Sequence, residues 1–568
     1  MCQQRVGPFF ERHARPGAPP PRVRYLGPDG WRWRLAHRRH HGRRAAGEGW
    51  ADAIAETSRR FAYFTHHSFR FVSSVPLDAR DFEPGAYLET VCRGVWRHLL
   101  GGDERTVPVA GRVHARDGGR IGWALRQPHG NGFLRLASVL VDATLARSHE
   151  CVSVDEASFR TALAGLPRDA RRMLVPSHRS YLDFVLLSYL CFARPDLGIP
   201  IPHVAAASEF ARIPLLGWLF RRLHAFYLVR GQGHEDKRLT QTVGRLVREG
   251  CVLEFFLEGQ RSRSRRFLEP RRGLLRSLQA TGRPCALLPI AISYDHVPEE
   301  ASFLDELRGA PKPSMRLRDL LRWTGRLLRG DVELGHAHIA CGRPIRLDLE
   351  SDVHDLSRQL IAELQAHTVA TTHHLRAFLA ATAPAGVDLA WLREAIVRRG
   401  GHVLDGPPRR QPVHAVTERC LREHIAPWFL AEAALAYAGN PGIEAHVRRQ
   451  SWGARGAAID AQAELADARV RSVVRALFDP VCAAKVAGVR ALLADAGASL
   501  PAPAELARRL PAAHLPDLEA LYEELAEGGL LVRADRGASW SFGPRAAELL
   551  RYAAACETIG LPVEEGPR

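Results

Sequence analysis

His178 and Asp183 are a pair of residues whose types and spacing suit catalysis. They lie in the stretch VPSHRSYLDF, which begins at the end of an apolar, strand-like run and continues into an apolar, helix-like one. A histidine titrates near neutrality, so it can take a proton from a hydroxyl, and a carboxylate on one ring nitrogen fixes its tautomer. This spacing across a strand-to-helix junction can bring Asp183 beneath His178. The free backbone N–H groups of a helix start would suit an oxyanion or a phosphate.

The spacing alone does not single out this pair. A chain with 26 histidines is expected to contain about one such match by chance. His98 and Asp103 have the same spacing, but they lie at the end of a helix-like stretch, which favours an ordinary surface loop. The catalytic interpretation therefore depends on the segments that follow His178.

The stretch FFLEGQRSRSRR, at 255–266, is the second segment whose residues suit binding or catalysis. Glu258 follows an apolar strand-like run, and Gly259 allows the backbone to turn tightly. Arg261 and Ser262 then present donors in quick succession. A guanidinium binds phosphate through a planar fork, and hydroxyl and N–H groups complete such a cradle. The alternative is a solvated basic loop.

Two further segments carry single residues of interest. Arg230 ends the strand-like run HAFYLVRG, where a charge is costly unless it meets a partner; the alternative is an ordinary charge at a strand end. Pro289 lies inside the apolar run LLPIAISYDHVPE. A proline there indicates an edge strand, a bulge or a wall beside a ligand, and the alternative is a core residue.

Strand-like and helix-like stretches alternate between residues 171 and 350, and they position these residues. The alternation predicts an α/β fold, with a mixed, largely parallel sheet flanked by helices. Ligands in such sheets bind beyond the carboxyl ends of the strands. His178, Glu258 and Tyr294 each follow a strand-like run, so we expect them to converge on one rim.

The pattern of the whole chain predicts four regions. They are a basic, poorly ordered tail at 1–50, a mainly helical region at 51–165, the α/β domain at 166–350 and a helical region at 351–568.

Composition narrows the partners. The chain has 79 Lys and Arg against 62 Asp and Glu, a net charge of +17, which suits nucleic acid, an acidic membrane face or a phosphorylated ligand. The ten cysteines form no CxxC pair, which favours reduced thiols over a disulfide framework or a zinc site. The apolar stretch at 184–193 is too short to span a bilayer, and the one at 213–229 is broken by charges. We therefore expect a soluble or peripherally bound protein.

Four segments, in their order and separations, resemble the four acyltransferase blocks of the glycerol-3-phosphate and dihydroxyacetone-phosphate acyltransferases. They are VPSHRSYLDF, HAFYLVRG, EFFLEGQRSRS and LLPIAISYDHVPE. The resemblance covers about 170–345 and is vaguer in the helical C-terminal region. It implies transfer of a fatty acyl group from acyl-CoA or acyl-carrier protein to the 1-hydroxyl of glycerol 3-phosphate. The product would be lysophosphatidate for phospholipid synthesis, made by a peripheral protein on the cytoplasmic face of the cell membrane.

The resemblance also implies roles for individual residues. His178 would be the general base and Asp183 its orienting carboxylate, with Arg179 and Ser180 in the same block. The acceptor site, with its arginines on the phosphate, would comprise Arg230, Glu258, Gly259, Arg261 and Ser262. Pro289 falls in the block associated with the acyl donor. No metal or other cofactor is implied, because the acyl donor is a co-substrate.

Two positions depart from the family pattern. Val229 stands where the second block usually has the first of two arginines, and Gln260 stands where the third block usually has Thr or Gly. Val229 removes an expected phosphate contact, for which Arg221, Arg222 and Arg263 are the candidate replacements.

Other functions fit some of the same features. Dihydroxyacetone phosphate is an equally compatible acceptor, whereas a lysophosphatidate acyltransferase is disfavoured because those chains resemble the α/β core alone. A non-catalytic protein that binds anionic lipid or nucleic acid would suit the net charge. The presence of both His178 and Asp183 counts against it, and so does the lack of interleaved aromatic and basic residues beyond the tail. We therefore expect no nucleic acid as a partner. An anionic membrane surface remains a predicted partner through residues 213–229, for which a core helix is the alternative.

Overall fold

The structure is a computed structural model of the full chain. It describes residues 106–108, 119–127, 131–167, 169–207, 222, 224–228, 237–312, 325–326, 332–404, 415–450, 459–495, 500–533 and 539–557. The expected tail at 1–50, most of the apolar stretch at 213–229, Val229 and Arg230 lie outside these ranges.

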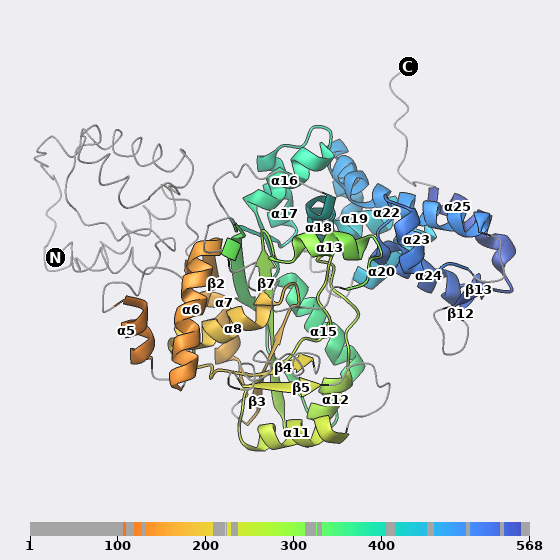
Figure 1. Cartoon of the computed structure of the whole chain (residues 1–568). Coiled ribbons are helices and arrows are strands. Elements are labelled where there is room, and N and C mark those ends of the chain that lie inside the picture. The colour runs from red at the N-terminus through yellow and green to blue at the C-terminus, as the bar shows by residue number, and fades with distance from the viewer. Residues whose placement is uncertain are drawn as a thin grey trace, which may run out of the picture.

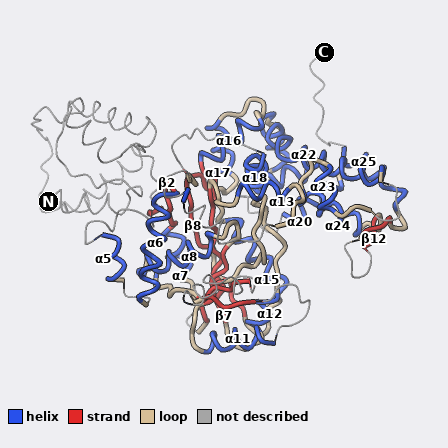
Figure 2. Tube along the Cα trace, in the orientation of Figure 1, coloured by secondary structure: helices blue, strands red, loops and turns tan. Residues whose placement is uncertain are grey.

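A nine-stranded sheet forms the centre of the described structure (Figure 2). Its order is β1-β2-β8-β7-β3-β6-β4-β5, with β9 also paired to β7. The strands are β1 (Thr106–Pro108), β2 (His149–Asp155), β3 (Arg171–Pro176), β4 (His203–Ala207), β5 (Ala225–Leu228), β6 (Leu253–Glu254), β7 (Cys285–Tyr294), β8 (Gly335–Cys341) and β9 (Ile345–Leu347). The pairings of β3 with β6 and β7, of β4 with β5 and β6, and of β2 with β8 are parallel. The predicted mixed, largely parallel sheet is confirmed.

Strand β3 shows why the sheet is covered on both faces. Side chains alternate across a strand, so Leu174 enters one apolar core while Met173 and Val175 enter another. Helices α6 (Gly132–Ser148), α7 (Glu156–Ala164), α8 (Leu182–Ala193) and α13 (Glu300–Leu307) pack on the first face. Helices α11 (Lys237–Arg248), α12 (Gly273–Gln279) and α15 (Val353–Ala366) pack on the second. Figure 1 shows α11 and α12 at the lower end of the molecule, with α6 and α8 to the left.

The sheet extends beyond the expected α/β domain at 166–350. Strands β1 and β2 precede it, yet β2 pairs with β8 along most of its length and β1 pairs with β2. The buried Val152 and Val154 of β2 belong to the same core as β7 and β8. The region assigned to helices before residue 166 therefore contributes strands to this sheet, because its alternating valines pair with a strand nearly 200 residues later.

Pro289 lies in the middle of β7 and is buried. On one side β7 pairs with β3 from Cys285 to Ile290, and on the other its partner changes from β9, up to Leu287, to β8, from Ile290. Pro289 stands where the partners change, so its missing N–H removes no hydrogen bond from either ladder. Its carbonyl accepts the N–H of Gly342 at 2.8 Å. The structure therefore places Pro289 in the core of a central strand rather than at an edge.

The chain after residue 366 is largely helical in its described part and lies at one end of the sheet (Figure 1). Its helices include α16 (Thr372–Thr382), α17 (Leu389–Arg398), α18 (Ala415–Ile425), α19 (Leu430–Ala436), α20 (Pro441–Gln450), α22 (Ala468–Ala494), α23 (Pro503–Arg509), α24 (Leu515–Glu527) and α25 (Leu549–Glu557). Two small sheets accompany them, β10 (Val369–Thr371) with β11 (His402–Leu404) and β12 (Leu531–Arg533) with β13 (Trp540–Phe542). Among the described residues, no helix combines the length and the apolar character needed to cross a membrane.

Candidate active site

His178 lies in the loop between β3 and α8, at the carboxyl end of a central strand. Its Nδ1 donates a hydrogen bond to Oδ2 of Asp183 at 3.0 Å, the contact expected from their spacing. The ring is buried and stacks on Phe256, with 3.9 Å between the ring centroids. Because Nδ1 carries the hydrogen in this bond, the lone pair of the neutral ring is on Nε2. Nε2 is therefore the nitrogen able to accept a proton.

Asp183 is fully buried and accepts hydrogen bonds on both carboxylate oxygens. Oδ2 accepts the backbone N–H groups of Arg179 at 2.7 Å and Ser180 at 2.9 Å, in addition to His178. Oδ1 accepts the hydroxyl of Tyr294, the last residue of β7, at 2.8 Å. These donors hold the carboxylate in place against the imidazole.

The backbone N–H groups at the start of α8 are already paired. Arg179 and Ser180 donate to Asp183, Tyr181 donates to Oε1 of Glu299 at 2.7 Å, and Leu182 donates to Oγ of Ser180 at 2.9 Å. The expectation that these groups would bind an oxyanion or a phosphate is therefore wrong. Two carboxylates, one on the helix itself and one from the loop after β7, occupy the donors first.

Glu258 is buried beside His178 and joins three residues of the site through its carboxylate. It accepts the backbone N–H of His178 at 2.9 Å and that of Leu268 at 3.0 Å. It also pairs with the guanidinium of Arg179, whose Nη1 lies 2.8 and 3.0 Å from its two oxygens. Arg179 in turn lies 4.1 Å above the ring of Phe267. The structure thus brings Arg179 and Glu258 together as a buried ion pair.

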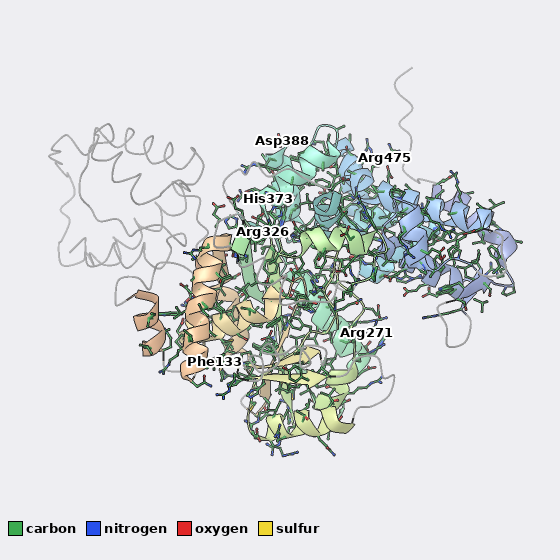
Figure 3. All side chains as sticks on the ribbon, viewed as in Figure 1. Phe133, Arg271, Arg326, His373, Asp388 and Arg475 are labelled. Carbon is green, nitrogen blue, oxygen red and sulfur yellow. The ribbon has the colours of Figure 1, made fainter. Side chains whose placement is uncertain are left out.

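Ser262 also serves the local backbone. Its N–H donates to the carbonyl of His178 at 2.8 Å, and its hydroxyl donates to the carbonyl of Arg266 at 2.6 Å. Gly259, in the same loop, has a φ of +69°, a conformation that glycine adopts without strain. A Cβ there would come within 2.8 Å of Cγ of Arg271, which Figure 3 labels. The neighbouring Gln260 is exposed, so its departure from the family pattern disturbs no buried contact.

Arg261 is the buried cation of this site with hydrogen-bonding capacity to spare. Its guanidinium lies 3.8 Å over the ring of Tyr181 and 5.0 Å from that of Phe303. Nη1 lies 3.4 Å from Oε1 of Glu299 and forms no hydrogen bond with the described residues. Arg261 thus keeps one guanidinium nitrogen without a hydrogen-bond partner among the described residues. By contrast, Arg263, one of the arginines expected to compensate for Val229, pairs with Glu306.

Glu299 is a residue that the sequence did not indicate. It accepts the hydroxyl of Ser180 at 2.8 Å as well as the N–H of Tyr181, and it faces Arg261. Burial raises the pKa of its carboxyl, and the charge of Arg261 opposes that rise. Glu299 lies 119 residues after Ser180, so only the folded chain brings the two together.

An apolar cavity opens beside His178. The space between its lining residues has a volume of about 980 Å³, including the part open to solvent. Residues of α6, α8, β4 and the loop between β6 and α12 line it. They include Leu134, Val141, Val185, Ser188, Phe192, Val204, Ala206 and Phe256. Such a cavity suits an aliphatic chain, whose burial contributes about 0.8 kcal/mol per methylene.

The protonation state of His178 suits a general base. Burial lowers the pKa of His178, while the hydrogen bond and charge of Asp183 raise it and so oppose the effect of burial. The neutral imidazole therefore predominates at neutral pH. The described residues contain no group of three or more His, Cys, Asp or Glu that could hold a metal ion.

Comparison with known proteins finds a family model that matches part of the chain. Residues 161–293 match a family model described as Acyltransferase. A solved structure to which the chain is similar is the 1-acyl-sn-glycerophosphate (LPA) acyltransferase PlsC from Thermotoga maritima. The two share 19% identity over 41% of this chain and 80% of that chain, with a TM-score of 0.25, which is too low to inform the site. The matched residues include His178, Asp183 and Arg261.

Proposed function

We propose that this protein transfers a fatty acyl group from acyl-CoA or acyl-carrier protein to the 1-hydroxyl of glycerol 3-phosphate. The product is lysophosphatidate, a precursor of phospholipids. One observation carries the proposal: His178, with Asp183 on its Nδ1, lines an apolar cavity inside a domain of the acyltransferase family. The choice of acceptor rests on the resemblance of the four sequence blocks.

In this reaction Nε2 of His178 takes the proton of the acceptor hydroxyl while the hydroxyl oxygen attacks the thioester carbonyl. A carbon–oxygen bond forms, the carbon–sulfur bond breaks, and the proton passes from the imidazolium to the thiolate that leaves. Asp183 stabilises the imidazolium between these steps. General-base action of this kind contributes about 10²- to 10⁴-fold to the rate.

The two substrates meet at His178 from different sides of the proposed site. The aliphatic chain of the donor occupies the cavity between α6 and α8. The phosphate of the acceptor binds Arg261, whose Nη1 has no hydrogen-bond partner among the described residues. Anchoring the phosphate places the hydroxyl near the base and the carbonyl, and such orientation accelerates bimolecular reactions strongly.

We further propose peripheral association with an anionic membrane, where the lipid product of this chemistry resides. Large apolar side chains of two adjacent helices support it. Ile121 and Leu125 of α5 (Gly119–Arg126) and Leu136 and Leu140 of α6 are each about 60% exposed or more. Flotation with anionic vesicles tests it: the protein should rise with the lipid, and the Leu136→Ser/Leu140→Ser variant should rise less. Recovery of all the wild-type protein at the bottom of the gradient would refute the association.

The function is tested by assaying acyl transfer directly. Purified protein is given palmitoyl-CoA or palmitoyl-acyl-carrier protein together with labelled glycerol 3-phosphate, dihydroxyacetone phosphate or lysophosphatidate, each in turn. The proposal expects glycerol 3-phosphate to be acylated fastest and His178→Ala to be inactive. Preference for another acceptor would overturn the substrate, whereas no transfer to any acceptor would overturn the enzyme.

A further inference from the structure

Tyr294 holds the side of Asp183 that faces away from the histidine. Its hydroxyl donates to Oδ1 at 2.8 Å, while the other three donors of Asp183 all bind Oδ2. Tyr294 is 2% exposed, and burial together with the charge of Asp183 raises the pKa of its phenol, so it remains a donor. The two residues are 111 positions apart. Tyr294 thus fixes the rotation of the carboxylate about its Cβ–Cγ bond.

The C-terminal region holds Tyr294 in its turn. His374, in the first turn of α16, has its Nε2 at 2.9 Å from the carbonyl oxygen of Tyr294. Its Nδ1 accepts the backbone N–H of Thr371 at 3.0 Å, so the hydrogen of the neutral ring is on Nε2, which donates to Tyr294. Thr371 also donates through its hydroxyl to Oδ1 of Asp295, the next residue, at 2.6 Å. The start of α16 therefore contacts the end of β7 at two successive residues, and the guanidinium of Arg265 donates to the carbonyl oxygens of the same two residues.

We propose that Tyr294 is a positioning residue of the His178–Asp183 pair, and that the start of α16, Thr371 to His374, sets the position of Tyr294. This inference rests on the proposed acyl transfer, but it concerns the geometry of the pair rather than the acceptor. Tyr294 is not among the residues that line the cavity beside His178. This arrangement gives the C-terminal helices a role in catalysis, because a series of hydrogen bonds runs from His374 through Tyr294 and Asp183 to His178.

Loss of the phenol has a definite electrostatic sign. A carboxylate deprived of one donor attracts a proton more strongly, so Asp183 stabilises the imidazolium of His178 more and the pKa of His178 rises. The other charged or titratable groups whose charges act on this pair are Arg179, Glu254, Glu258, Arg261 and Glu299. The substitution Tyr294→Phe leaves all of them in place.

The test compares Tyr294→Phe with the wild-type full-length protein. The variant loses a hydrogen bond to a charged carboxylate, and this loss should lower kcat by roughly 10- to 100-fold. The KM values for donor and acceptor should change less than twofold, and the acidic limb of the kcat profile should move to higher pH. Tyr437→Phe is the matched control, because Tyr437 donates to a carboxylate, Asp479, within the C-terminal helices. It should leave the profile unchanged.

His374→Gln tests the second half of the inference. Glutamine at this position of a capping box can still accept the N–H of Thr371, but it lacks the imidazole donor to Tyr294. It should lower kcat in the same direction as Tyr294→Phe, and the double variant should lose less than the product of the two effects. Independent, multiplicative effects would overturn the link through α16.

A measurement without turnover separates this inference from the proposed function. The pKa of His178 is followed by NMR in protein with labelled histidine, using His178→Gln to assign the signal. A higher pKa in Tyr294→Phe supports the positioning role whichever acceptor the enzyme uses. An unchanged pKa, or a kcat equal to that of the wild type, would overturn it. Failure of acyl transfer in the wild type would overturn the proposed function alone.

Discussion

The carboxylate of Glu258 accepts a hydrogen bond from the backbone N–H of His178 at 2.9 Å, although 80 residues separate them. The same carboxylate pairs with Arg179 and is itself fully buried. The third of the four sequence blocks therefore supports the backbone of the first through this carboxylate. Glu258 fixes the backbone that presents the imidazole, whereas Nη1 of Arg261, three residues later, has no hydrogen-bond partner among the described residues.

Replacing Glu258 by glutamine should destabilise the protein strongly. The amide oxygen can still accept the N–H of His178, but the guanidinium of Arg179 stays buried without a counter-charge. Breaking a buried pair in this way costs about 3–5 kcal/mol of unfolding free energy, measured by urea denaturation. The control is Asp169→Asn, which removes an exposed pair with Arg346 and should have no measurable effect. A Glu258→Gln variant of normal stability but raised acceptor KM would show instead that Glu258 binds the acceptor.

Replacing Asp183 by asparagine should abolish most activity while the fold persists. The amide oxygen can take the place of Oδ2 and keep its three donors, and the hydroxyl of Tyr294 can reverse to accept the amide N–H. The negative charge that stabilises the imidazolium is lost, so kcat should fall by about 10²- to 10⁴-fold. Since Asp183 raises the pKa of His178, the acidic limb should move to lower pH, opposite to Tyr294→Phe. Near-normal kcat would contradict the role of Asp183.

The sequence predicted the parts of this site that are local. His178 and Asp183 are joined across one strand-to-helix junction, so their spacing was enough to anticipate the contact. The pairing of the backbone donors at α8 could not be foreseen, because Glu299 reaches them from 119 residues away. Tyr294 was placed on the same rim, since it ends a strand-like run, but nothing in its neighbourhood indicated that Asp183 would be its partner. Such contacts depend on the order of the strands in the sheet, which local sequence patterns do not reveal.

The same limit applies to the sheet. The alternation of strands and helices predicted its parallel centre, where helices α8, α11 and α12 follow strands β3, β5 and β6. Strand β8 instead pairs antiparallel with β7 and parallel with β2, which lies before the expected domain. The short run His149–Asp155 carries only a brief alternation, Val152 and Val154, between helical stretches. Its place in the sheet is decided by pairing with residues far along the chain.

Buried histidines should make the protein less stable in acid. Burial lowers the pKa of His424 to about 3 and that of His514 to about 4, both from 6.5, with nearby arginines adding to the effect. The unfolded chain therefore binds protons that the folded chain does not, and stability falls as the pH drops below 6.5, by up to about 1.4 kcal/mol per pH unit for each histidine. Urea denaturation at pH 7.5 and 5.5 measures this fall. His424→Gln, which can keep a donor to the carbonyl of Val369, should reduce the slope; an unchanged slope would contradict the assignment.

Filling the cavity should shorten the acyl chain that the enzyme accepts. Ser188 lies on the face of α8 that lines the cavity, so Ser188→Trp removes space beside it. Each methylene that can no longer be buried loses about 0.8 kcal/mol, so kcat/KM for a palmitoyl donor should fall roughly tenfold or more relative to an octanoyl donor. Ser188→Ala, which enlarges the cavity slightly, should keep the wild-type ratio. Equal losses for both donors would indicate that the aliphatic chain binds elsewhere.

Replacing Glu254 by methionine should stabilise the protein. Glu254 lies on β6, fully buried, and neither of its carboxyl oxygens has a hydrogen-bond partner among the described residues. Burial and the charge of Asp183 raise its pKa well above 4.5, so the folded chain keeps a proton that the unfolded chain releases. Its effect on stability therefore becomes more unfavourable as the pH rises above 4.5 toward the folded pKa. Methionine removes both this linkage and the desolvated polar group, a gain of about 1–3 kcal/mol.

Urea denaturation of Glu254→Met at pH 5 and pH 8 should show a gain in stability that is larger at pH 8. The matched control is Glu306→Met, since Glu306 is also buried but pairs with Arg263, and losing it should destabilise the protein. A Glu254→Met variant that is less stable than the wild type would contradict the unpaired state of the carboxyl. A variant that is more stable but inactive would mean that the chain retains this carboxylic acid beside Asp183 for the reaction, at a cost to its own stability.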